Sequence, residues 1–162
     1  MIVSNQEAVC NIFNEYFSNI GNNLAKRIIS NSDIDPLRSI QSVQSSIYLR
    51  PTNSNEIITL MHRLDTKKSC GSDNIPASLL KNNCDVFANL LTTCFNKILD
   101  TGIYPDSLKV AKLTPVFKSR HIDDPCNYCP ISTLSVFNKI FEKFLVNKII
   151  EFFSRHNRLY NL

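Results

Sequence analysis

Glycine is scarce in this chain and tryptophan is absent, since the 162 residues include three Gly and no Trp. Sandwiches and barrels need many short strands joined by turns, so this composition favours helices. No apolar run approaches the about 20 residues that a membrane-spanning helix needs. The first ten residues, MIVSNQEAVC, lack the basic and then apolar pattern of a secretory signal. We therefore expect an intracellular protein, cytoplasmic or nuclear, that is not secreted and has no membrane partner.

The motifs of common enzyme classes are also missing. The sequence has no GxSxG elbow, Walker loop, HExxH motif or dinucleotide-binding glycine pattern. Cys126 and Cys129 have the spacing of metal ligands, but a structural zinc site needs four ligands and no second pair follows. We interpret them as two unrelated reduced thiols, and Asp123–Asp124 beside Pro125 as a turn. The sequence therefore predicts no catalytic residue and no metal site.

Helical periodicity accounts for most of the chain. Apolar residues recur every three or four positions over residues 4–29, 53–65, 84–101 and 135–156. Ser4 and Asn53 each precede a Glu by three residues, which is the pattern of a capping box, and Gly102 fits a C-terminal cap. Asp73 is a candidate cap for a short helix near Pro76. Because the apolar stripe of residues 84–101 is wide, we expect that helix to lie deep in the core.

Two strand-like runs, residues 109–117 and 128–134, flank a polar loop. Alternate side chains of a strand point to opposite faces. One parity of the first run is apolar: Ala111, Leu113, Pro115 and Phe117. Lys112 and Lys118 have the other parity and lie roughly 20 Å apart on the opposite face. The pattern predicts a β-hairpin with basic residues near its tip, where Arg120 also lies; an ordinary surface hairpin is the alternative.

Positive charge is concentrated in the last third of the chain. The formal net charge is +4, and residues 109–162 contain nine Lys and Arg against four Asp and Glu. Such asymmetry suggests a surface that faces a polyanion, although a solvated surface is the alternative. Phosphate contacts need only positive charge or free N–H groups. Five basic loop and hairpin residues meet this requirement: Lys67, Lys68, Lys112, Lys118 and Arg120.

Three spaced motifs carry a resemblance to a known family. They are KKSCGSDNIPASLLK at 67–81, NKILDTGIYPDSLKVAKLTPVFK at 96–118 and NYCPISTLSVFNKIFEKFL at 127–145. In this order they resemble the N-terminal part of the reverse transcriptase of non-LTR (LINE-type) retrotransposons. That family typically reads K-K-S-x-G-x-D-G-I-P, then a G-x-x-P segment ending in P-x-x-K, then N-Y-R-P-I-S. The resemblance runs from about Asn11 to the end of the chain.

The resemblance implies an α+β fold, mainly α-helical with a small antiparallel β-hairpin. This would be the fingers of a right-hand polymerase fold, without palm and thumb. It divides the chain into a helical lead-in at 1–66, with a mobile Ser- and Asn-rich linker at 30–46, and a partial reverse transcriptase domain at 67–162. The family activity it implies is RNA-templated DNA synthesis.

The resemblance also implies two sets of binding residues. The template-binding set consists of Lys67, Lys68, Gly71 and Asp73. The set that binds phosphates of the incoming nucleotide or nearby template consists of Lys118, Lys112 and Arg120.

The chain departs from the family pattern in two ways that matter and in one milder way. Cys129 replaces the usual Arg, and a neutral thiol cannot act as a guanidinium fork. Asn74 replaces a Gly, which is milder because Asn also tolerates positive φ. The sequence stops near where the family continues to the palm aspartates, which hold two Mg²⁺ ions. We therefore expect a truncated, inactive reverse transcriptase fragment without a bound cofactor.

Two alternative functions stay open on the sequence alone. The first is a residual nucleic-acid-binding module that contacts RNA or DNA through the basic loops. The second is a helical interaction protein, in which the apolar surface left by a missing palm mediates self-association or binds a partner.

Overall fold

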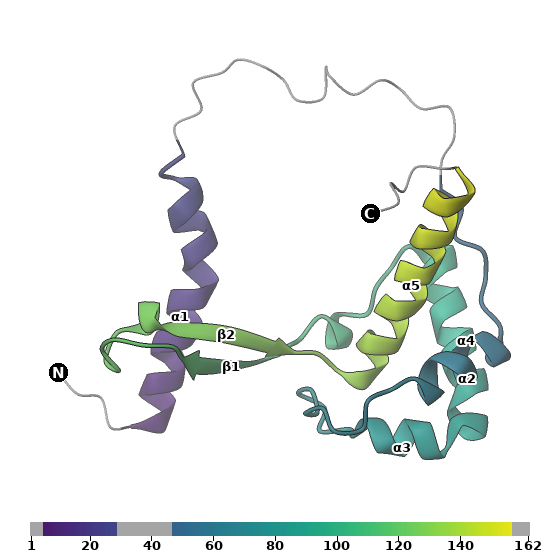
Figure 1. The fold of residues 1–162 in the computed structure, drawn as a ribbon, viewed down its shortest axis with the longest axis horizontal. Helices are drawn as coiled ribbons and strands as arrows, with labels where there is room; N and C mark the ends of the chain where they lie inside the picture. Colours follow the sequence, from purple (N-terminus) through teal and green to yellow (C-terminus); the bar gives the residue numbers. More distant parts are fainter. Residues whose placement is uncertain (1–4, 29–46, 157–162) are drawn as a thin grey trace. The chain divides into compact units, whose positions relative to one another are not determined.

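The computed structural model describes residues 5–28 and 47–156. In these ranges the chain is mainly helical, with one two-stranded antiparallel sheet formed by β1 and β2 (Figure 1). This confirms the expected α+β class. The described residues contain no helix that is long and apolar enough to cross a membrane. The predicted linker at 30–46 and the predicted cap Ser4 lie outside the described residues.

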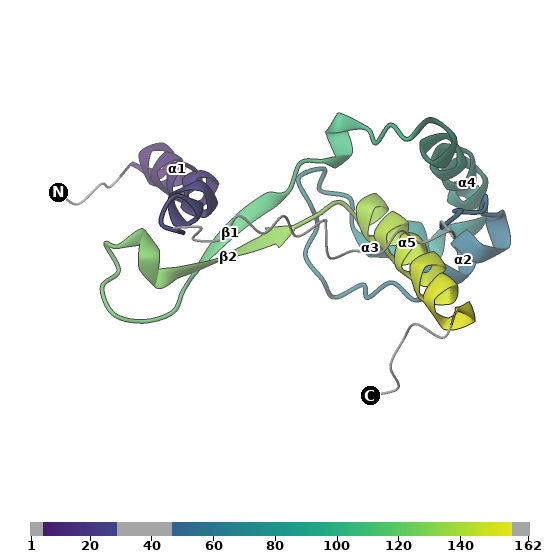
Figure 2. The same ribbon diagram turned by 90° about the horizontal axis from the view of Figure 1, so that it is seen from above.

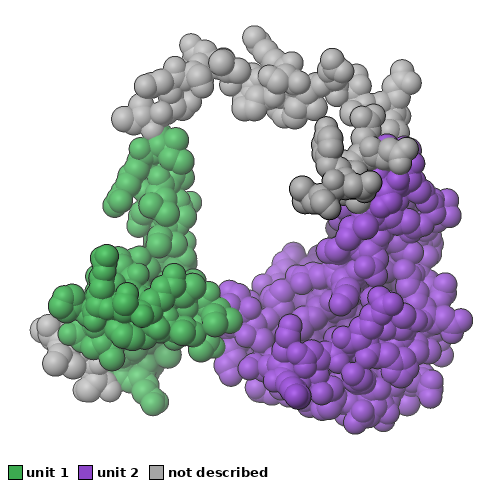
Figure 3. Space-filling model, in the orientation of Figure 1, with its two compact units in different colours: residues 1–44, 113–131 green, residues 45–112, 132–162 purple. Residues whose placement is uncertain are grey.

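The chain divides into two compact units (Figure 3). Unit 1 consists of residues 1–44 and 113–131, and unit 2 of residues 45–112 and 132–162. The motifs place one domain boundary, between residues 66 and 67, so that each expected domain is continuous in sequence. The two compact units are each made of two separate segments, because most of the hairpin packs with the N-terminal helix.

Unit 1 contains α1 (Gln6–Ala25) and most of the hairpin formed by β1 (Lys112–Phe117) and β2 (Tyr128–Thr133). Asn5, rather than Ser4, caps α1, since its side-chain oxygen accepts the Glu7 N–H at 3.0 Å. Figure 2 shows α1 beside the hairpin, where the Phe13 ring meets Tyr128 edge-on at 4.7 Å between centroids. No residue of α1 is fully buried.

Unit 2 contains α2 (Ser54–His62), α3 (Ala77–Asn82), α4 (Cys84–Thr101) and α5 (Val136–Arg155). The predicted cap Asn53 is confirmed, since its side chain accepts the Glu56 N–H at 3.0 Å. Gly102 ends α4 with φ of 64°, a left-handed value that glycine adopts without strain. Packing of α2 against α4 and α5 buries one apolar cluster that includes Ile57, Leu60, Met61, Leu80, Leu91, Phe95, Ile140, Phe141 and Phe144.

The expectation that residues 84–101 lie deep in a core is wrong. α4 buries only one side, with Leu91 and Phe95 fully covered. The side chains of Val86 and Leu90 are 72% and 58% exposed. Periodicity reports which residues are apolar, but the partner that covers them is decided by tertiary packing. Three residues of the predicted stripe, Val86, Leu90 and Cys94, are therefore exposed.

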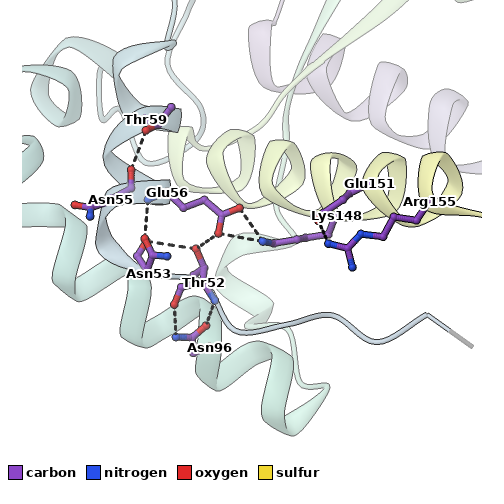
Figure 4. Close-up of polar contacts among 9 residues, drawn as sticks. All are labelled: Thr52, Asn53, Asn55, Glu56, Thr59, Asn96, Lys148, Glu151 and Arg155. Carbon is purple, nitrogen blue, oxygen red and sulfur yellow. Dashed lines mark hydrogen bonds and ion pairs between the residues drawn. The ribbon is translucent and has the colours of Figure 1, made fainter.

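A polar network joins the segment before α2 to α4 and α5 (Figure 4). The Thr52 backbone N–H donates to the side-chain oxygen of Asn96 at 2.8 Å, and the Asn96 side-chain N–H donates to the Thr52 carbonyl at 3.0 Å. The Thr52 hydroxyl donates to Glu56 at 2.8 Å, and the Lys148 ammonium lies 2.9 Å from the same carboxylate. Three helices are thus held in register by hydrogen bonds as well as by apolar packing.

Candidate nucleic-acid interface

The hairpin keeps the predicted alternation only in part, since Ala111 and Phe117, which were assigned to the apolar face, are exposed. Leu113 and Pro115 are half-buried, whereas Lys112 and Lys118 are exposed. The Lys118 N–H donates to the carbonyl of Asn127 at 2.8 Å beyond the paired strands. The backbone of Lys118 is therefore fixed, and its ammonium is free to reach a ligand in solvent.

The loop at the hairpin tip has its own internal hydrogen bonds. Asp124 accepts the Cys126 N–H at 2.9 Å, which confirms a turn at this position. This backbone N–H, the thiol of Cys126 and the nearby His121 lower the pKa of Asp124 below its usual value. Arg120 has φ of 75°, a value that is uncommon for a residue other than glycine. The loop thus holds Arg120 in a defined backbone conformation.

Cys126 and Cys129 have different surroundings. The hydroxyl of Tyr16 donates to the Cys126 sulfur at 3.2 Å, and this hydrogen bond raises the pKa of Tyr16. Cys129 is half-buried in β2. Over residues 5–28 and 47–156, no three His, Cys, Asp or Glu side chains gather closely enough to hold a metal ion.

The loop between α2 and α3 is held against the start of α5. Gly71 is buried, and a Cβ at this position would lie 2.6 Å from the backbone nitrogen of Ser135. Asp73 accepts the Ser135 hydroxyl at 2.5 Å and the Ile75 N–H at 3.2 Å. The prediction that Asp73 caps the next helix is wrong, because Pro76 occupies the cap position of α3 without a side-chain bond. Asn74 has φ of 56°, as expected for a position where the family has Gly.

A small hollow in unit 2 gathers basic side chains, and we call it the basic hollow. It has a volume of about 200 Å³, and its lining combines four apolar residues with four cations and one carboxylate. The charged residues are Arg63, Lys68, Lys139, Lys143 and Asp65. Of these, only Lys68 was predicted from the sequence. Lys139 and Lys143 lie four residues apart, hence on one face of α5, and that spacing was the available signal for them. The position of Arg63 depends on how α2 packs on α5.

The outer side of α4 borders a larger depression, which we call the apolar groove. It encloses about 680 Å³ between α4, the segment after it and the start of α5. Its lining includes Leu90, Cys94, Ile98, Ile103 and Phe137. Exposed residues of α4, Leu90 and Cys94, therefore form part of one wall of a concave apolar surface.

The predicted binding residues fall in both units. Lys118 and Arg120 belong to unit 1; the others, Lys67, Lys68, Gly71, Asp73 and Lys112, belong to unit 2. Within unit 2, the structure joins Gly71 and Asp73 to the start of α5. It also places Lys68 beside the cations of the basic hollow, whereas Lys67 is exposed outside that lining.

Comparison with known proteins gives matches to retrotransposon proteins of Drosophila melanogaster, and no family model matches the chain. A probable RNA-directed DNA polymerase from transposon BS is 32% identical over 109 residues, which are 66% of this chain and 12% of the relative. An RNA-directed DNA polymerase from the mobile element jockey is 28% identical over 108 residues, again 66% of this chain and 12% of the relative. A putative protein of the type-1 retrotransposable element R1DM is 28% identical over 98 residues, 59% of this chain and 10% of the relative.

These matches cover about two thirds of the chain but only about a tenth of each relative. They agree with the family that the motifs suggested. The chain is thus a relative of the RNA-directed DNA polymerases of non-LTR retrotransposons.

Proposed function

We propose that this chain forms the fingers of a non-LTR retrotransposon reverse transcriptase and binds nucleic acid through its basic loops. The observation that carries the proposal is the similarity over two thirds of the chain to retrotransposon proteins, two of which are named RNA-directed DNA polymerases. The hairpin supports it, because Lys112 and Lys118 are exposed on the face opposite its apolar side. Exposed cations on an ordered scaffold suit contacts to phosphates, which position a nucleic acid without reading its sequence.

In this proposal the binding residues divide into contact and positioning residues. Lys118, Lys112 and Arg120 contact phosphates, and Lys67 and Lys68 contact the template. Gly71 and Asp73 act indirectly: they hold the loop that carries the two lysines against the start of α5.

We further propose that these 162 residues do not synthesise DNA by themselves. Two-metal phosphoryl transfer requires clustered carboxylates, and the described residues provide no group of three metal-binding side chains. The residues present therefore do not fit a Mg²⁺ pair. Cys129 also argues against synthesis. The family has Arg at this position, and a neutral thiol cannot bind a triphosphate as a planar, charged guanidinium does.

A primer-extension assay tests the catalytic part of the proposal. The purified chain, an RNA template with an annealed primer, all four deoxynucleotides and Mg²⁺ should give no product above background. An intact retrotransposon polymerase under the same conditions is the positive control. Template-dependent extension by this chain would contradict the proposal.

A binding assay tests the hairpin. Labelled single-stranded RNA should bind the chain with an affinity that falls steeply with salt, with a log–log slope of about −0.7 per phosphate contact. Lys112→Glu with Lys118→Glu should weaken binding at least about tenfold, because two attractive contacts become repulsive. The matched control is Lys26→Glu with Lys97→Glu, an equal charge change just after α1 and within α4. Equal affinity of the hairpin variant and wild type would exclude the hairpin as the contact.

A second candidate function, protein–protein interaction, is favoured by the apolar groove. Its lining exposes apolar side chains of α4 and of the segment after it, and contiguous exposed apolar surface usually marks an interface. On the main proposal, the occupant is another part of a complete polymerase, since each relative extends far beyond the matched region.

A further inference from the structure

The basic hollow combines charge from three separate segments of unit 2. Arg63 follows α2, Lys68 lies in the next loop, and Lys139 and Lys143 lie in the first half of α5. Only one carboxylate, that of Asp65, shares the lining. Like charges repel one another at close range. An anion bound among the four cations would offset this electrostatic repulsion.

The cations of the basic hollow have no carboxylate partners among the described residues. Ion pairs over residues 5–28 and 47–156 join Lys109 to Asp106, Lys148 to Glu56 and Arg155 to Glu151. One carboxylate oxygen of Asp65 accepts the backbone N–H of Lys67 at 3.0 Å. The described residues therefore provide no ion-pair partner for these four cations.

The side chains of the basic hollow can reach a common ligand. Arg63, Lys68 and Lys143 are exposed, so their head groups are free to move toward an anion. Lys139 is half-buried and donates to the Ser69 carbonyl at 3.2 Å, which ties the loop to α5. A volume of about 200 Å³ is several times the roughly 30 Å³ that one water occupies. That is room for a tetrahedral phosphate group.

We propose that the basic hollow binds a phosphate group, with Arg63, Lys68, Lys139 and Lys143 as its ligands. The inference rests on the proposed nucleic-acid binding and deepens it, because three of the four ligands, Arg63, Lys139 and Lys143, are assigned by neither the motifs nor the comparisons. Arg63 supplies a planar fork that can hold two phosphate oxygens, and the lysines supply point charges. The phosphate can belong to an RNA backbone, a nucleoside triphosphate or inorganic phosphate, and the experiment distinguishes these sources.

The test uses the whole chain with Arg63→Gln and Lys143→Gln combined. Both side chains are exposed, so the fold should survive, and circular dichroism checks this. Anisotropy of a short labelled single-stranded RNA should show roughly three- to tenfold weaker binding, and the salt slope should become shallower by about 0.7 for each phosphate that the variant no longer binds. Lys97→Gln on α4 is the control that removes charge elsewhere, and Arg63→Lys with Lys143→Arg should restore most of the affinity. Competition by a nucleoside triphosphate or by inorganic phosphate identifies the source of the phosphate.

Each outcome decides the proposal. Wild-type affinity in the Gln double variant, together with weak binding in the hairpin variant, would overturn the basic hollow and leave the proposed function standing. Weak binding in the Gln double variant alone would support the hollow against the hairpin. If the wild-type chain binds no RNA, the proposed function fails, and inorganic phosphate still tests the hollow. Shifted backbone amides at 63–68 and 139–143 in an NMR titration would then support it, and unshifted amides would refute it.

Discussion

Of the three glycines, Gly71 is the one at which neighbouring atoms leave no room for a side chain. A side-chain carbon there would lie 2.6 Å from the Ser135 nitrogen and 2.8 Å from the Leu134 carbonyl carbon, both backbone atoms. Backbone cannot move aside as the end of a flexible side chain can. The small size of this residue, rather than a backbone angle, is what the packing requires.

Gly71→Ala should therefore lower the free energy of unfolding by about 1–3 kcal/mol, the usual cost of overpacking. The measurement is urea unfolding followed by circular dichroism. Gly21→Ala is the matched control, since nothing lies within 4 Å of the added carbon and alanine is favoured inside α1 by up to about 1 kcal/mol. Equal midpoints for wild type and Gly71→Ala would show that the close approach does not exist in solution.

At the scale of the element, the hairpin tip is held by short-range polar bonds. The Asp124 carboxylate accepts the Cys126 N–H, and its pKa lies below the usual value. A group with a lowered pKa in the folded state stabilises the fold above its unfolded pKa, and this contribution is lost as pH falls through the folded pKa. The turn should therefore loosen only in acid.

An NMR titration checks this expectation. The amide proton of Cys126 should shift with a midpoint below the roughly 3.9 of an unperturbed Asp. Asp124→Asn keeps an acceptor oxygen but removes the charge, so this transition should disappear, whereas Asp123→Asn should preserve it. A midpoint at or above the unperturbed value would rule out the hydrogen bond.

Elements whose ends depend on neighbouring residues were predictable from the sequence. Residues 84–101 form α4 with the predicted bounds, because Gly102 ends the helix locally. The cap of α1 was placed one residue early, since Ser4 and Asn5 are both good caps and only geometry chooses between them. The bond from Ser135 to Asp73 joins residues 62 apart, and the basic hollow needs three segments. No local pattern contains that information.

At the scale of the whole molecule, the apolar groove decides how the isolated chain behaves. The described residues leave Leu90 58% exposed at this groove, so self-association should bury it and its neighbours at high concentration. Leu90→Lys should shift sedimentation velocity profiles toward monomer, and should leave stability within about 0.5 kcal/mol because the side chain is exposed. Thr93→Lys, at the same groove but without loss of an apolar group, tests whether charge alone explains the shift. A wild-type chain that is monomeric at all concentrations would contradict the interaction.

The backbone atoms packed against Gly71 limit which mutations the gene can carry at this codon. Glycine is encoded by its first two codon bases, and every change in either base introduces a side-chain carbon or a stop. The backbone atoms around Gly71 exclude that carbon, so mutational tolerance at this codon is low for the fold itself. The limit on substitution at Gly71 thus comes from the backbone atoms around it and not from any chemistry that the residue performs.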